Sequence, residues 1–126
     1  MEEELKGSRV LIVENERAIA LVLTEIIELS GGVVIGPAYS LEDAFNIMEN
    51  HQFDCAVLDI QLKGTTVYPL ADELNENQIP FCFFSGMGEL VLPARFKENY
   101  FFEKPASLTE LINCLALISH SSDHLS

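Results

Sequence analysis

Four short apolar segments of the sequence each lead into polar side chains that could take part in chemistry. In chain order these side chains are Glu14 with Asn15, then Asp59, Ser85 and Lys104. Carboxylates bind hard cations such as Mg²⁺ through oxygen, and an aspartate can form a covalent aspartyl phosphate. A hydroxyl and a lysine ammonium can neutralise phosphoryl oxygens. If the fold brings these groups together, their types predict a phosphoryl-transfer site; alone, Asp59 could equally be a turn former.

The segments before these residues have the pattern of buried strands, because short apolar runs bounded by polar sequence are typical of strands covered on both faces. The expected strands are Arg9–Val13, Val33–Gly36, Cys55–Asp59, Phe81–Ser85 and Tyr100–Glu103. Apolar residues at helical spacing predict helices between them. These helices cover 17–30, begin at Ser40, cover 68–76, and begin at Ser107.

The alternation of strands and helices predicts an α/β fold with a doubly wound, five-stranded parallel sheet, flavodoxin-like, in the order 2-1-3-4-5. All the polar groups then meet at the carboxyl edge of the sheet. We expect a single domain over 1–126, with a core of about 9–119 and flexible ends at 1–8 and 120–126. The acidic start and the polar tail suggest a complete small protein.

Residues 86–99 should form the weakest element of the fold. Gly86, Gly88 and Pro93 all disfavour a continuous helix, whereas Leu90 and Phe96 would gain by docking on the sheet. The balance is close, so we expect a broken fourth helix that orders when the site is activated.

Composition excludes several classes of function. The net charge of −13 argues against binding to nucleic acid, which needs clustered Lys and Arg. No apolar run reaches the roughly 18 residues of a membrane span, and the acidic start is not a secretory signal. Three cysteines without metal-type spacing read as reduced core residues of a cytoplasmic protein: Cys55, Cys82 and Cys114.

Four motifs resemble the CheY-like receiver domain of bacterial two-component response regulators. They are Val-Glu-Asn-Glu at 13–16, Val-Leu-Asp-Ile at 57–60, Ser85-Gly86 and Lys104-Pro105. The resemblance extends from about Arg9 to Ser119. It implies a phosphoacceptor regulatory domain rather than an enzyme, with self-catalysed phosphotransfer and dephosphorylation. Such a domain signals by binding a downstream protein or acts as a phosphate sink.

The resemblance also assigns roles to individual residues. It implies that Asp59 accepts a phosphoryl group from the phosphohistidine of a histidine kinase or a phosphotransfer protein. Glu14, Asn15, Asp59 and the backbone carbonyl of Gln61 would hold Mg²⁺.

The remaining roles concern the ends of the expected strands Phe81–Ser85 and Tyr100–Glu103. Lys104 would pair with the phosphoryl group, and Ser85 and Phe101 would act as the switch residues. The Lys104–Pro105 bond would be cis, which the dipeptide alone would not indicate because most X-Pro bonds are trans.

Two further motifs suggest a subgroup. Residues 80–86 resemble the PFxFATG motif of receivers associated with HWE-type histidine kinases, and Gly64-x-x-x-Tyr68-Pro69-x-Ala71 fits the same group. Phe84 stands where the motif has alanine and Ser85 where it has threonine. We expect the Phe84 ring to point away from the site, into a layer packed by helices.

Asn15 is the main departure from the family, whose members usually carry two acids here. An amide offers only a neutral oxygen, so Mg²⁺ binding should be weak. Glu16 could replace the missing acid, although a favourable interaction with the helix dipole is the preferred explanation for it. Asn15 also leaves open a pseudo-receiver, an interaction module that is never phosphorylated. A cofactor binder or small hydrolase is disfavoured by the acidic loop after the first strand and the lack of a G-x-S-x-G motif.

Overall fold

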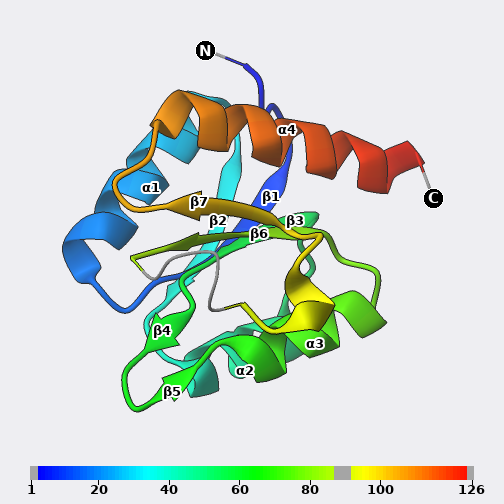
Figure 1. Cartoon of the computed structure of the whole chain (residues 1–126). Helices are drawn as coiled ribbons and strands as arrows, with labels where there is room; N and C mark the ends of the chain where they lie inside the picture. Colours follow the sequence, from blue (N-terminus) through cyan, green and yellow to red (C-terminus); the bar gives the residue numbers. More distant parts are fainter. Residues whose placement is uncertain (1–2, 87–91, 125–126) are drawn as a thin grey trace.

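Five parallel strands form the central sheet of the computed structural model, which describes residues 3–86 and 92–124 (Figure 1). The elements are β1 Arg9–Val13, α1 Arg17–Leu29, β2 Val33–Ala38, α2 Leu41–Asn50, β3 Cys55–Leu58, β4 Gln61–Leu62, β5 Thr65–Thr66, α3 Tyr68–Glu76, β6 Phe81–Ser85, η2 Ala94–Phe96, β7 Tyr100–Glu103 and α4 Leu108–His124. The strand order β2-β1-β3-β6-β7 is the predicted doubly wound order.

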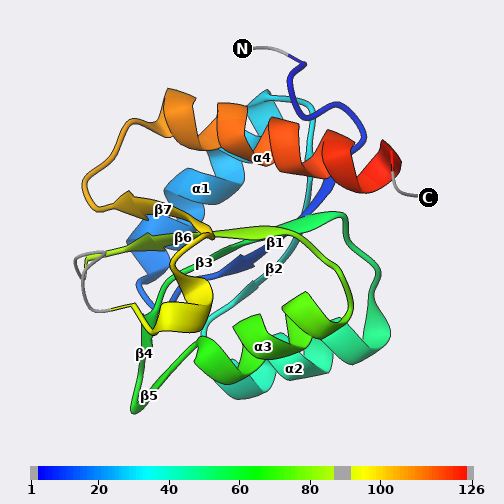
Figure 2. The same cartoon turned by 45° about the vertical axis from the view of Figure 1, so that its right-hand side comes forward.

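Helices cover both faces of this sheet (Figure 2). Alternate strand residues face opposite layers, as the period of two requires. One set packs with α2 and α3: Leu11, Val13, Ala56, Leu58, Phe81 and Phe83. The other set packs with α1 and α4: Val10, Ile12, Cys55, Val57, Cys82 and Phe84. Phe84 therefore lies in the helix-packed layer, as expected, and all three cysteines are buried and free.

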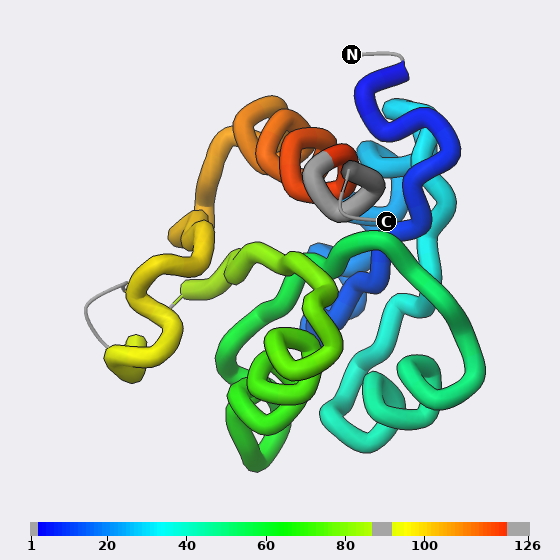
Figure 3. Tube along the Cα trace, turned by 90° about the vertical axis from the view of Figure 1, so that its right-hand side faces the viewer, coloured from blue at the N-terminus to red at the C-terminus, as the bar shows by residue number. Residues whose placement is uncertain are grey.

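The start of the chain is packed rather than loose, so the expectation of a flexible segment over 1–8 is wrong for residues 3–8. Leu5 is fully buried, and its N–H donates to the carbonyl of Ser30 at 2.8 Å. The hydroxyls of Ser119 and Ser8 lie 2.8 Å apart, which ties this segment to α4. The segment and the coloured part of α4 lie on the same side of the molecule (Figure 3). Helix α4 also continues through His124, past the expected start of the tail at 120.

Glycine defines the end of α1 and a bend in β2. Gly31 has a φ of +89°, and a Cβ at Gly32 would lie 2.8 Å from Ile27. Gly36 has a φ of +97° and precedes a cis bond to Pro37, a feature that was not predicted. Strand β2 extends beyond this bend to Ala38, two residues further than expected.

The loop after β3 differs from the sequence analysis, whereas the described part of the region after β6 agrees with the expected broken fourth helix. The expected loop after β3 contains a small antiparallel hairpin, β4–β5, in which Gln61 pairs with Thr66. Between β6 and β7 the chain forms the short 3-10 helix η2, and Phe96 is fully buried. Residues 87–91 of the expected weak helix lie outside the described residues. Among the described helices, none is long and apolar enough to cross a membrane.

Candidate acidic site at the carboxyl edge of the sheet

Glu14 and Asp59 lie side by side where β1 and β3 end. The two strands pair in register through Val13 and Leu58, so the residues that follow leave the sheet together. The Asp59 N–H donates to the Val13 carbonyl at 2.9 Å, and the Glu14 N–H donates to the Ala38 carbonyl at 2.9 Å. Only 1% of Glu14 and 5% of Asp59 are exposed. The sheet thus places two carboxylates in a largely buried position.

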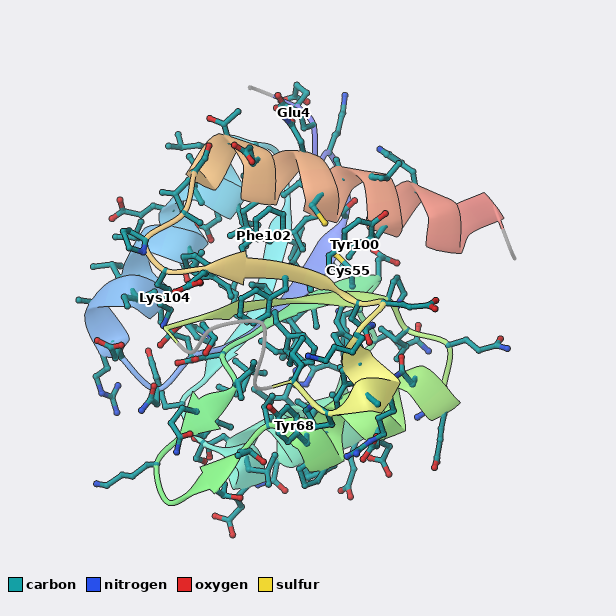
Figure 4. All side chains as sticks on the ribbon, viewed as in Figure 1. Glu4, Cys55, Tyr68, Tyr100, Phe102 and Lys104 are labelled. Atoms are coloured by element: carbon teal, nitrogen blue, oxygen red, sulfur yellow. The ribbon has the colours of Figure 1, made fainter. Side chains whose placement is uncertain are left out.

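Lys104 neutralises this pair from the end of β7. Its Nζ lies 2.8 Å from Glu14 Oε1 and donates to Asp59 Oδ2 at 3.3 Å. The backbone N–H of Lys104 donates to the Ser85 carbonyl at 2.8 Å, which joins the ends of β6 and β7. Nζ also lies 5.5 Å from the centre of the Phe84 ring. Figure 4 shows Lys104 at the edge of the sheet where β7 ends.

Glu16 is the third carboxylate of the site. It occupies the N-cap position of α1, but among the described residues its side chain caps no N–H of that helix. Its backbone N–H donates to Glu14 Oε2 at 3.1 Å. One oxygen each of Glu14, Glu16 and Asp59 lie within 4.8 Å of one another. Glu16 thus lies close to the other two acids, and its favourable interaction with the dipole of α1 stays a prediction.

Burial and mutual repulsion change the protonation of this cluster. Burial, as the main cause, together with the charge of Asp59, raises the pKa of Glu14 from 4.5 to about 7, against the lowering effect of Lys104. Burial lowers the pKa of Lys104, but its hydrogen bond to Glu14 and the nearby charges of Asp59 and Glu14 outweigh it, so the net shift is upward. The Lys104 ammonium therefore stays protonated, and positively charged, at this edge of the sheet.

The raised pKa of Glu14 predicts a pH-dependent stability in metal-free buffer. Between 4.5 and about 7 the folded state holds a proton that the unfolded state has lost. The free energy of unfolding should therefore fall as the pH rises through this window and stay low above it. Glu14→Gln should abolish this fall, since it keeps the oxygen that faces Lys104 but cannot ionise. Relative to the wild type, the variant should gain about 1–3 kcal/mol between pH 5 and pH 8.

Urea unfolding at several pH values with EDTA, followed by circular dichroism, would measure this difference. Glu28→Gln, at an exposed position near the end of α1, is the control of equal charge change. A difference between Glu14→Gln and the wild type that does not vary with pH would contradict the prediction.

The other residues singled out from the sequence lie around this cluster. Ser85 is fully buried at the end of β6. Phe101 of β7 packs against Phe83, with ring centres 6.5 Å apart. Asn15 is exposed beside Glu14, and Gln61 is exposed in β4. The Lys104–Pro105 bond is cis, as the resemblance implied.

An apolar groove of about 650 Å³ adjoins the cluster. Glu16 and Lys104 form its polar end, so the groove opens directly beside the acids. Its apolar lining comes from α1, the end of β6 and the start of α4: Ala18, Ile19, Val22, Leu23, Phe84, Ala106 and Leu108. The sequence analysis did not identify this groove, although the exposed Val22 within an apolar helix face was a visible signal.

Comparisons with known proteins point to one family. The model described as the response regulator receiver domain matches residues 10–116. The transcriptional regulatory protein PdtaR of Mycobacterium tuberculosis is 26% identical over 113 residues, which cover 86% of this chain and 55% of that protein. The chain therefore spans about half the length of the curated relatives it matches.

Two solved structures illustrate the likeness in fold. The CheY-like receiver domain protein of Methanospirillum hungatei is 20% identical, with a TM-score of 0.85, and the match covers 96% of this chain and all of that one. The response regulator TrrA of Thermotoga maritima, solved in complex with Mg²⁺ and BeF, is 18% identical. Its TM-score is 0.77, over 88% of this chain and 98% of that one.

Proposed function

Because this chain belongs to the response regulator receiver domain family, we propose that it is a phosphoacceptor switch of two-component signalling and that Asp59 is the acceptor. The observation that carries the proposal is the convergence of a buried Asp59 with the Lys104 ammonium, 3.3 Å away. A lysine in this place can neutralise charge on a phosphoryl group as it arrives. The proposed donor is the phosphohistidine of a histidine kinase or a phosphotransfer protein.

In the proposed reaction a carboxylate oxygen of Asp59 attacks the phosphorus of the donor. The new O–P bond forms as the P–N bond of the phosphohistidine breaks, and the imidazole leaves with the electron pair of that bond. Lys104 can exchange its contact with Asp59 for one with the transferred oxygens. We assign Ser85 to a hydrogen bond with the phosphorylated side chain. We assign Phe101, in β7, to the conformational switch that follows phosphorylation.

The donor atoms at the site fit the metal that the family binds, because hard carboxylate oxygens are the ligands that Mg²⁺ prefers. We assign its binding to Glu14, Asp59 and the backbone carbonyl of Gln61, with Asn15 at the position of the second acid. When bound, the ion supplies positive charge for the phosphoryl oxygens. The relative TrrA, solved with Mg²⁺ and BeF, supports this assignment.

The test is phosphorylation by a small donor such as acetyl phosphate, read by intact mass. The wild type should gain the mass of one phosphoryl group with Mg²⁺ and far less with EDTA, since the metal neutralises the reacting oxygens. Asn15, which replaces an acid, favours a second candidate: an interaction module that is never phosphorylated. No mass gain with acetyl phosphate or phosphoramidate at high Mg²⁺ would contradict the phosphoacceptor and favour that module.

We propose that the protein partner docks along the apolar groove. A donor seated there would lie beside Glu16 and Lys104, which line both the groove and the acidic site. The resemblance of residues 80–86 to the PFxFATG motif suggests a kinase of the HWE type. The net charge of −13 disfavours nucleic acid as the downstream target, so we propose a protein target in the cytoplasm.

A further inference from the structure

We infer that Glu16 supplies the anionic metal ligand that Asn15 lacks, so that the third carboxylate of the metal site comes from residue 16. This inference rests on the proposed function, since it concerns the same site. It differs from the family pattern, in which the second acid stands at the position of Asn15. The chain would thus keep three carboxylates at the metal while moving one of them along the loop by one residue.

The first argument is distance. Glu14, Glu16 and Asp59 each present a carboxylate oxygen within 4.8 Å of the other two. Oxygens that share one Mg²⁺ lie at most about 4.2 Å apart, because each Mg–O distance is about 2.0–2.1 Å. Only one pair of the three oxygens can lie opposite each other at that distance, and the other pairs lie about 2.9 Å apart around the ion, so the groups need to approach by up to about 2 Å. The Glu16 side chain, 63% exposed, has room to make that adjustment.

The second argument is that one cation, the Lys104 ammonium, already lies against all three carboxylates. The Lys104 Nζ lies 2.8 Å from Glu14, 3.3 Å from Asp59 and 3.8 Å from Glu16. All three carboxylates are thus directed at one positive charge. The contact to Glu16 is longer than a hydrogen bond, so this carboxylate loses least when a metal replaces the ammonium.

The third argument is that the backbone holds Glu16 in place. Its N–H donates to the second oxygen of Glu14, at 3.1 Å, which joins the two residues independently of any ion. Because Glu16 caps no N–H of α1 among the described residues, the helix does not compete for its carboxylate.

The experiment is a titration of unphosphorylated protein with Mn²⁺, a close analogue of Mg²⁺, with free Mn²⁺ followed by electron paramagnetic resonance. Glu16→Gln should weaken binding at least about fivefold, because affinity depends on the number of charged ligands. Asn15→Ala removes a neutral oxygen and no charge, so it should weaken binding less than Glu16→Gln does. The double variant Asn15→Asp with Glu16→Gln moves the charge to the family position and should restore binding.

Glu28→Gln is the matched control for loss of one charge from α1, and it should bind Mn²⁺ like the wild type. Thermal unfolding in EDTA checks that every variant is folded. Unchanged affinity in Glu16→Gln, or a loss in Asn15→Ala as large as in Glu16→Gln, would overturn the inference. The titration contains no phosphodonor, so it tests metal binding by Glu16 and not phosphorylation. The intact-mass measurement tests the phosphoacceptor proposal separately.

Discussion

Asp59→Asn should abolish the mass gain that the wild type shows with acetyl phosphate and Mg²⁺. An amide oxygen is a far weaker nucleophile than a carboxylate, so the O–P bond cannot form. The substitution is nearly isosteric and leaves the backbone hydrogen bond from residue 59 to Val13 intact. It also removes one of the charges that repel Glu14. The variant should therefore remain folded, and intact mass should show one unmodified species.

The matched control is Asp54→Asn, at the other end of β3. Asp54 accepts a hydrogen bond from the Arg9 N–H at 2.8 Å, and an asparagine oxygen can still accept it. This control should gain one phosphoryl group as the wild type does. An undiminished gain in Asp59→Asn would show that another residue is the acceptor.

Phe83→Ala should have the largest effect on stability. The side chain is fully buried at the centre of an aromatic cluster, with ring centres 5.3 Å from Phe81, 5.6 Å from Phe96 and 6.5 Å from Tyr68. Truncating a buried phenylalanine costs about 3–5 kcal/mol, from lost burial and from the cavity left behind. Since a domain of this size has about 5–15 kcal/mol of stability in total, the variant should be close to unfolding.

Urea unfolding followed by circular dichroism would measure this loss. Phe83→Leu keeps most of the apolar volume and should lose less than about 1.5 kcal/mol. Leu29→Ala, at a position that is 71% exposed, should change stability by at most about 0.5 kcal/mol. A loss below about 1 kcal/mol in Phe83→Ala would contradict tight packing between the sheet and the α3 side.

Much of the fold follows from local sequence pattern. The predicted bounds of Phe81–Ser85, Tyr100–Glu103 and the helix at 68–76 agree with β6, β7 and α3. In each case apolar residues recur at the spacing of a strand or a helix, and polar residues, glycine or proline mark the ends. Such a pattern can be recognised within a few residues of the sequence. The strand order was also predictable, because alternating strands and helices leave few right-handed ways to wind a parallel sheet.

The sequence could also predict which groups meet at one edge, but not how they share charge there. Glu14, Asp59 and Lys104 had to meet because parallel strands end together. Lys104 contacts three carboxylates, Glu14, Glu16 and Asp59. These contacts depend on side-chain distances between segments that lie up to 90 residues apart in the sequence.

Only the tertiary structure determined the parts that depend on distant neighbours. Leu5 lies in an acidic segment that has no periodic pattern, yet it is buried, and Gly32, where a Cβ would lie 3.2 Å from the Leu5 Cβ, leaves room for it beside α1. The pKa of Glu14 is raised mainly because the folded chain buries it, and further because the charge of Asp59 lies close by. Local pattern thus determined the elements and the identity of the reactive groups, whereas burial and charge sharing arose only when the sheet brought those groups together.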